Sequence, residues 1–171
     1  MRTCAILEKI AHMRHGHAAC TLAASVPQCQ LEAMSHASLL APVFAQVALT
    51  FILLFWMGRE RYRAVARKEV DVTDVVHGDG KWPKKARQVA ASFHNQLEIP
   101  PLFYLVSVLA LITETAGPAF LALAWGFVIS RIAHMAIHVT SNDVKLRGPV
   151  YVVGVFILMA MWVILAYGVA V

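Results

Sequence analysis

The chain has 171 residues, of which 59% are hydrophobic and 15% are charged, and its mean hydropathy is +0.63. A water-soluble domain carries about 25% charged residues, so the composition excludes an ordinary soluble domain. The formal net charge of +5 is concentrated, because nine of the 15 Lys and Arg residues lie between Arg59 and Arg87. Basic residues gathered beside apolar segments are typical of membrane-protein loops, which argues against a nucleic-acid partner.

The N-terminal segment, residues 1–36, differs from the rest of the chain. It contains all three cysteines, and Cys4, Cys20 and Cys29 lack the paired spacing of a metal site. Free thiols are therefore favoured over a zinc site or a disulfide. Its one apolar run is too short for a secretory signal, and Met34 precedes a long apolar stretch. We expect residues 1–36 to be a poorly ordered extension, with Met34 as a candidate start, and assign no function to it.

Four apolar segments follow the extension. Residues 37–58 and 148–171 contain no charge, and each is long enough to cross a bilayer, which takes about 20 residues. The two apolar segments between them reach that length only by including one charged residue each, Glu98 in the second and Arg131 in the third. The sequence therefore predicts one all-α domain over residues 37–171, an integral membrane four-helix bundle.

The loops indicate how the bundle is oriented. The loop at 59–85 is long and basic, and the loop at 142–147 carries Lys145 and Arg147. The link at 114–118 is a compact turn without Lys or Arg. Cytoplasmic loops are enriched in Lys and Arg, so we expect both basic loops in the cytoplasm, and both chain ends and the compact turn outside.

Glu98 and Arg131 are expected at the same depth in the membrane. Counted inward from the turn between the second and third spans, Glu98 lies 16 residues deep and Arg131 lies 14, a difference of about 3 Å at the helical rise. An unpaired charge at the centre of a membrane helix costs about 2.5–3.5 kcal/mol, and opposite charges at one depth can pair to lower that cost. Pro100-Pro101, just past Glu98, predicts a kink in the second helix.

Further polar residues accompany these two charges at helical spacing. Those that share a broad face of the second helix with Glu98 are Arg87, His94 and Asn95, and those that share a face of the third helix with Arg131 are His134 and His138. Lipid cannot satisfy such faces, so we expect them to turn inward or toward a neighbouring subunit. The result is a predicted polar pocket that opens toward the cytoplasm, with Arg87, Lys145 and Arg147 near its mouth. A structural clasp between Glu98 and Arg131 is the alternative.

Three features of the chain occur together: the sequence His94-Asn95-Gln96-Leu97-Glu98-Ile99-Pro100, the long basic loop before it, and the sequence Arg131-Ile-Ala-His134. Together they resemble the MAPEG family, membrane-associated proteins in eicosanoid and glutathione metabolism that include microsomal glutathione transferases and prostaglandin E synthase. The resemblance covers residues 37–171. It is to a bacterial-type member, which implies a location in the inner membrane.

The resemblance implies a homotrimer that holds glutathione, as a co-substrate, between neighbouring subunits near the cytoplasmic side. Asn95 and Glu98 match the family's glutathione-contacting Asn and Glu, and Arg131 with His134 matches its Arg-x-x-His element. His138 stands where the prostaglandin synthase has a tyrosine in that pocket. The binding candidates are Arg87, His94, Asn95, Glu98, Arg131 and His134.

Two positions depart from the family's pattern. Family enzymes commonly have an arginine four residues before the Asn, where this chain has Ala91, with Arg87 one helical turn further back. The sequence at 145–149 is similar to its counterpart in the prostaglandin synthase, but the later arginine implicated in that enzyme's chemistry aligns near Tyr151. The catalytic candidates, which would stabilise a reactive thiolate, are Tyr151, Arg147 and His138.

We therefore expect a membrane-embedded, glutathione-dependent transferase or peroxidase-like protein that acts on a lipophilic electrophile arriving from the bilayer. A non-catalytic glutathione- or lipid-binding protein with the same fold is the main alternative. A haem protein using His94, His134 and His138 is a second, although nearby acids and arginines suit an anion better. A small transporter is a third, with little support because no internal repeat is visible.

Overall fold

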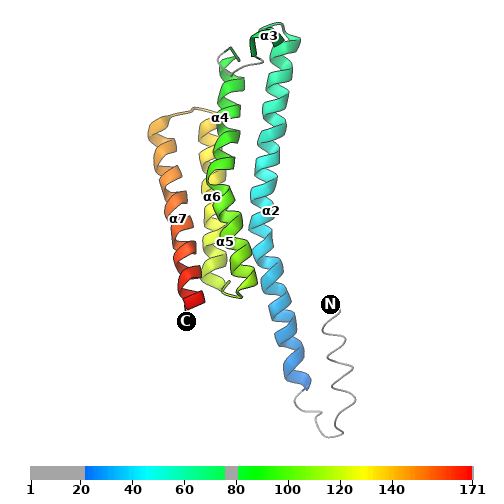
Figure 1. Cartoon of the computed structure of the whole chain (residues 1–171), viewed down its shortest axis with the longest axis vertical. Helices are drawn as coiled ribbons and strands as arrows, with labels where there is room; N and C mark the ends of the chain where they lie inside the picture. Colours follow the sequence, from blue (N-terminus) through cyan, green and yellow to red (C-terminus); the bar gives the residue numbers. More distant parts are fainter. Residues whose placement is uncertain (1–21, 76–80, 171) are drawn as a thin grey trace. The chain divides into compact units, whose positions relative to one another are not determined.

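The computed structural model describes residues 22–75 and 81–170, and every element in those ranges is a helix. The features described below belong to the compact unit that begins at Leu39. The expected poor order of residues 1–36 stays a prediction, since residues 1–21 lie outside the described residues and the first described helix begins at Leu22. The helices are α2 (Leu22–Ala66), α3 (Val72–Val75), α4 (Lys84–Glu98), α5 (Pro100–Ile112), α6 (Pro118–Val139) and α7 (Val144–Ala170) (Figure 1).

In the part of the chain that the structure describes, four helical stretches are long and apolar enough to cross a membrane, which confirms the predicted all-helical, four-span architecture. Their ends differ from the sequence expectation. α2 continues to Ala66 rather than ending at Gly58, and α7 begins at Val144 rather than Gly148. Charged residues end an apolar stretch without ending a helix, because Arg and Lys are good helix formers. The spans are Ser38–Ala66, Lys84–Ile112, Pro118–Val139 and Val144–Ala170.

The second span is divided into α4 and α5 at Ile99, which confirms the kink predicted from Pro100-Pro101. Neither proline has a backbone N–H, so the carbonyls four residues earlier lose their helical donors. Ile99 itself keeps φ −97° and ψ −40°, and α5 starts directly at Pro100. The break makes Glu98 the last residue of α4.

An apolar core joins α5, α6 and α7. Phe103 and Phe127 are completely buried, and their rings stack with centroids 4.6 Å apart. Lipid removes most of the hydrophobic driving force between membrane helices, so close packing of this kind holds the bundle together. α6 and α7 also approach closely at Gly154, where an added Cβ would lie 2.8 Å from the Oγ of Ser130.

Polar contacts fix α4 between α2 and α6. Gln46 of α2 donates a hydrogen bond to Gln96 of α4 over 2.8 Å, and both side chains are buried. From another side of α4, the side chain of Gln88 donates to the backbone carbonyl of His138 over 2.6 Å. The last carbonyls of a helix have no helical donor, so Gln88 satisfies one of them. These contacts set the rotation of α4, and therefore which of its residues face α6.

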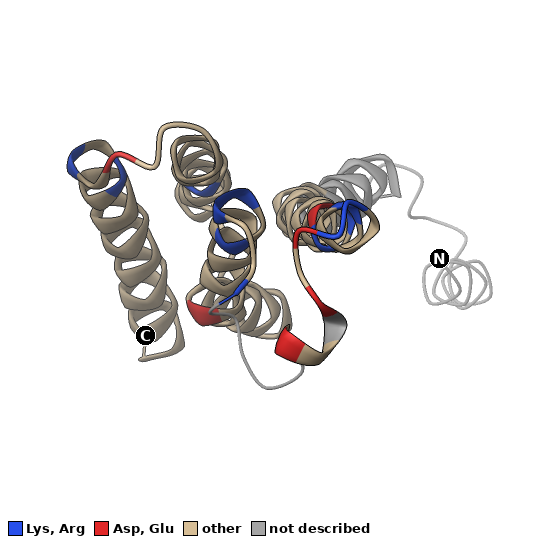
Figure 2. Ribbon diagram, turned by 90° about the horizontal axis from the view of Figure 1, so that it is seen from above, with Lys and Arg blue, Asp and Glu red and all other residues tan. Residues whose placement is uncertain are grey.

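The outer surface of the spans is apolar. Phe44, Phe55 and Phe156 are 65%, 73% and 63% exposed, and lipid chains are the environment that suits such side chains. Lys and Arg gather at one end of the bundle, where α2 ends and where α4 and α7 begin (Figure 2). The protein is therefore a multi-pass integral membrane protein. The cytoplasmic position of its basic end stays a prediction.

We expect the positive-inside rule to hold for both basic loops. In a background whose native cysteines are replaced by serine, Lys68→Cys and Lys145→Cys should react with a membrane-impermeant maleimide only after the cells are permeabilised. Thr115→Cys, in the turn between α5 and α6, should react in intact cells. The opposite labelling pattern would reverse the predicted orientation.

Gly154→Ala should destabilise the α6–α7 pair, because the new Cβ would lie 2.8 Å from Ser130 Oγ and overpacking of an interior costs about 1–3 kcal/mol. Gly126→Ala is the matched control, since its Cβ meets nothing closer than an Ile157 carbon at 3.6 Å. Adding Ser130→Ala to Gly154→Ala should recover most of the loss. Unfolding in mixed detergent micelles measures these differences, and equal losses for the two glycine variants would contradict the close contact.

Candidate functional site

α6 carries a buried polar face at the spacing noted in the sequence. Arg131, His134 and His138 are 0%, 2% and 3% exposed, although each is polar and lies within a membrane span. Tyr151 of α7 packs against this face. Its ring centroid lies 5.4 Å from the Arg131 guanidinium carbon and 5.6 Å from the His134 ring centroid. The structure thus brings binding candidates of α6 together with a catalytic candidate of α7.

The guanidinium of Arg131 is only partly satisfied. Its Nη2 lies 3.4 Å from the Nδ1 of His134, while its buried Nε and Nη1 have no acceptor among the described residues. An unsatisfied buried donor costs about 1–3 kcal/mol, and more when it is charged. A carboxylate accepts two parallel hydrogen bonds from a guanidinium. The chemistry of these free donors therefore fits an anionic group.

Asn95 reaches the same face of α6 from α4. Its Nδ2 lies 3.4 Å from the Nδ1 of His138, whose ring centroid is 5.7 Å from that of His134. The Gln88 bond to the His138 carbonyl lies beside this contact. Sequence reasoning missed Gln88, although its position one residue after Arg87 and seven before Asn95 places it on the Asn95 side of the helix.

Glu98 and Arg131 do not form the expected pair within one chain. No ion pair or hydrogen bond between them occurs among the described residues, although their charges still attract each other electrostatically. Glu98 is exposed at the end of α4, whereas Arg131 is turned toward Tyr151 of α7. The helical rise predicts equal depth for the two residues, but depth does not fix the rotation of a helix about its axis.

Arg147 and Lys145 lie at the beginning of α7. The Arg147 guanidinium donates to the Oδ1 of Asn142 over 2.7 Å, and Lys145 is exposed. Arg147 precedes Tyr151 by four residues, one helical turn, so both catalytic candidates of α7 lie along the same side of that helix. Arg147 remains half-buried and Tyr151 partly so.

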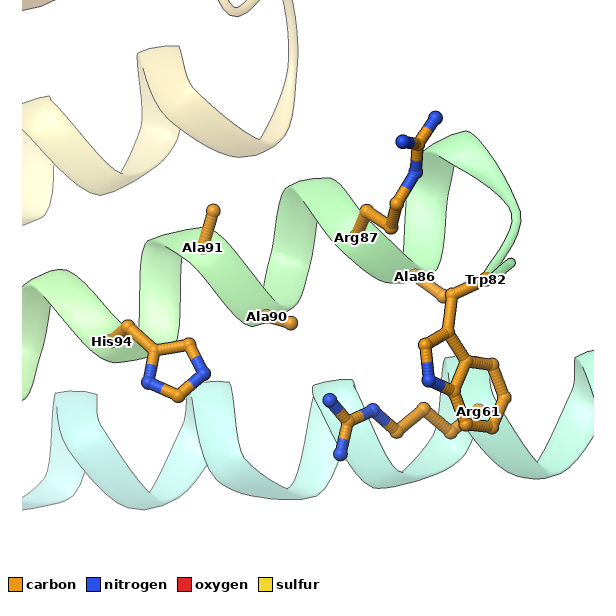
Figure 3. Close-up of a pocket in the computed structure, with 7 residues that line it drawn as sticks. All are labelled: Arg61, Trp82, Ala86, Arg87, Ala90, Ala91 and His94. Carbon is orange, nitrogen blue, oxygen red and sulfur yellow. The ribbon is translucent and has the colours of Figure 1, made fainter. Parts of the chain in front are cut away.

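The remaining binding candidates, Arg87 and His94, lie at a different place. Both line a cavity of about 200 Å³ between α2 and α4, together with Arg61 of α2 and Trp82. The Arg61 and Trp82 side chains and the His94 ring lie between the two helices, while the Arg87 guanidinium extends outward from α4 (Figure 3). These two candidates thus line the α2–α4 cavity, whereas the Asn95 amide approaches His138 of α6.

Little in the sequence indicated the α2–α4 cavity. Arg61 belongs to the basic segment that indicates membrane topology, and Trp82 precedes Pro83, the N-cap residue of α4. Haem ligation by three histidines is not supported by this geometry, since His94 lines the α2–α4 cavity whereas His134 and His138 face Asn95 and Tyr151.

A protein-family model for the MAPEG family matches residues 39–167, which is most of the chain. The match spans all four membrane helices and every candidate site residue. Neither curated proteins nor solved structures gave a match to this chain. On the family match, this chain belongs to the MAPEG family and is a membrane protein of the glutathione- and eicosanoid-metabolism type.

Proposed function

We propose that this protein is a glutathione-dependent transferase or peroxidase that acts on a lipophilic electrophile, as a homotrimer in a bacterial inner membrane. Family membership supports glutathione as the co-substrate. The observation that carries the proposal is the Arg131 side chain, which is completely buried in a membrane span and retains N–H groups without an acceptor. An intramembrane charge of this kind is a functional feature by default.

Glutathione presents carboxylates, an ammonium group and a thiol, and the α4–α6–α7 residues offer a partner for each. The charge of Arg131 attracts a carboxylate through a low-dielectric interior, and Arg147 stands at the more open end of the same site. The Asn95 side-chain amide can form hydrogen bonds with a peptide group of the ligand. The Glu98 carboxylate carries the charge opposite to that of the ligand's ammonium group.

A neighbouring subunit would reconcile the positions of Glu98 and Arg131. Glu98 is exposed on its own protomer, while Arg131 is covered on its own. In a trimer, the exposed carboxylate of one protomer contacts the ammonium end of a ligand whose carboxylate end lies toward the arginine of the next. In this arrangement each charged group of the buried ligand lies next to a side chain of opposite charge, which offsets the cost of removing it from water.

The reactive form of glutathione is the thiolate. A free thiol has a pKa of about 8.5, which a nearby positive charge or hydrogen-bond donor lowers. The Tyr151 hydroxyl, the His138 ring and Arg147 are the candidates for stabilising that thiolate. Its sulfur then forms a bond to the electrophilic atom of a lipophilic substrate while the bond from that atom to the leaving group breaks, and the leaving group departs with the electron pair and takes up a proton.

A non-catalytic glutathione- or lipid-binding protein is the second candidate. It is favoured by one specific observation: each catalytic candidate already has a partner within the chain. Tyr151 lies against Arg131, His138 is near Asn95, and Arg147 donates to Asn142. Residues with these contacts fulfil a structural role without any reaction.

Glutathione should bind the detergent-purified protein saturably, and Glu98→Gln should weaken that binding roughly tenfold because one charge-assisted hydrogen bond is lost. Arg131→Met, which removes the charge at similar volume, should weaken it at least as much. Isothermal titration calorimetry measures both affinities, and size-exclusion chromatography checks that each variant keeps its assembly.

Glu114→Gln is the matched control, since it removes an exposed carboxylate at the opposite end of the second span and should bind glutathione like the wild type. The absence of binding by well-folded wild-type protein would refute the glutathione proposal, and would leave Arg131 as a structural residue of the α6–α7 contact.

Tyr151→Phe keeps the ring over Arg131 and removes only the hydroxyl. If the hydroxyl stabilises the thiolate, kcat for thiol conjugation should fall about 10- to 100-fold while glutathione affinity changes little. The assay uses an aryl halide, an unsaturated carbonyl and a lipid hydroperoxide as electrophiles. Tight glutathione binding without turnover of any of these by the wild type would establish the non-catalytic role instead.

A further inference from the structure

We propose that Gln88 of α4 is a positioning residue for His138. Together with Asn95 it holds the His138 ring in the tautomer that carries its proton on Nε2, and this N–H donates to the glutathione sulfur. The part that concerns glutathione rests on the proposed function, whereas the tautomer depends only on contacts within the chain. Gln88 itself does not contact substrate, because its amide nitrogen faces two backbone carbonyls of α6.

The C-terminal end of α6 is capped by side chains of α4. The last four carbonyls of a helix have no donor within that helix. In α6, two of them accept backbone N–H groups of the residues that follow. The other two accept side chains of α4: Gln88 donates to the His138 carbonyl over 2.6 Å, and Lys85 donates to the Val139 carbonyl. The turn that carries the His138 ring is therefore fixed by α4.

The amide group of Gln88 is engaged twice. Its Nε2 lies 2.6 Å from the carbonyl oxygen of His138 and 3.3 Å from that of Thr140. An amide nitrogen carries two hydrogens, so each has an acceptor. Helix ends fray more readily than helix interiors. With both N–H groups bound to backbone carbonyls, Gln88 keeps the end of α6 from opening.

The ring of His138 is held from the same face of α4. Asn95 follows Gln88 by seven residues, or two helical turns, so the two side chains project from one face. The Nδ2 of Asn95 lies 3.4 Å from the Nδ1 of His138. An amide nitrogen only donates, so Nδ1 accepts, and the neutral ring carries its proton on Nε2. Helix α4 thus holds His138 both at its carbonyl and at its ring.

The ring contact depends on the backbone contact. A distance of 3.4 Å between Asn95 and His138 is longer than the usual 2.7–3.2 Å of such bonds, so a shift of about half an ångström would break it. The neighbouring ring of His134, whose centroid lies 5.7 Å away edge-on, does not select between the two tautomers. Gln88 therefore controls, through the backbone, whether Asn95 can select one.

The selected tautomer is the one that stabilises a thiolate. Nε2–H is the only N–H of the neutral His138 ring, and no acceptor for it occurs among the described residues. A hydrogen bond donated to the charged form of a group favours that form. The other tautomer would present a lone pair at Nε2, which repels an anionic sulfur.

NMR of the imidazole nitrogens tests the positioning role. The full-length protein, isotopically labelled at its histidine nitrogens and free of glutathione, is studied in detergent at about pH 8.5, well above the ordinary histidine pKa of about 6.5. The signals of His138, identified by their loss in His138→Phe, should show the proton on Nε2 alone. Gln88→Met should replace them with shifts averaged between the two tautomers.

Three further variants separate positioning from simple helix capping. Lys85→Met is the matched control, since it removes the donor of the adjacent Val139 carbonyl and should keep the wild-type tautomer. Gln88→Lys restores a donor, and Lys85 shows that a lysine of α4 reaches an α6 carbonyl, so this variant should also keep it. Gln88→Glu has nearly the shape of glutamine without the donor. It should lose the single tautomer, and it replaces Gln88→Met if that variant folds poorly.

Kinetics connect the tautomer to the reaction. Gln88→Met should lower kcat for thiol conjugation about tenfold, because the thiolate loses an oriented donor. The KM for glutathione should change by less than about twofold, since Gln88 does not contact the ligand. Lys85→Met should keep both constants. An altered tautomer with unchanged kcat would overturn the role of His138 toward the thiolate.

Two results would overturn the positioning role itself. One is a wild-type His138 ring with its proton on Nδ1, and the other is the same nitrogen pattern in Gln88→Met and Lys85→Met. The spectra are recorded without glutathione, so they decide the positioning role whether or not the protein binds glutathione. Failure of this inference is therefore distinct from failure of the proposed function.

Discussion

The completely buried guanidinium of Arg131, in the middle of a membrane span, is the constraint on which the rest of the bundle depends. Its burial costs free energy that only close partners offset. The ring of Tyr151 lies over it, His134 lies beside its Nη2, and Gly154 allows α7 to approach the aliphatic part of the side chain. The close α6–α7 pair therefore positions the candidate site and also contains the charge that gives the site its affinity for anions.

Helix α4 has a different chemical environment on each side. Lys85 donates to the carbonyl of Val139 at the end of α6 and also lies 5.5 Å from the ring of Trp56 on α2, so one side chain connects three helices. With its rotation set in this way, α4 presents Asn95 to α6 and His94 to α2.

Ala91 is a position at which the chain departs from the family's pattern. Family enzymes commonly carry an arginine at that position, and here the small side chain lines the α2–α4 cavity. The same substitution removes one cation from the surroundings of Asn95 and Glu98.

The sequence by itself determined the membrane class, the four spans, the break at Pro100-Pro101 and the polar face of α6, because these follow from hydropathy, proline chemistry and helical periodicity along one chain. The residue types of the candidate site could also be predicted from the sequence. Only the tertiary structure decided that Glu98 lies outside while Arg131 lies inside, and that Arg61 and Trp82 join Arg87 and His94. Spacing along a helix fixes depth and relative direction, whereas the rotation of each helix against its neighbours depends on packing and hydrogen bonds between segments far apart in the sequence.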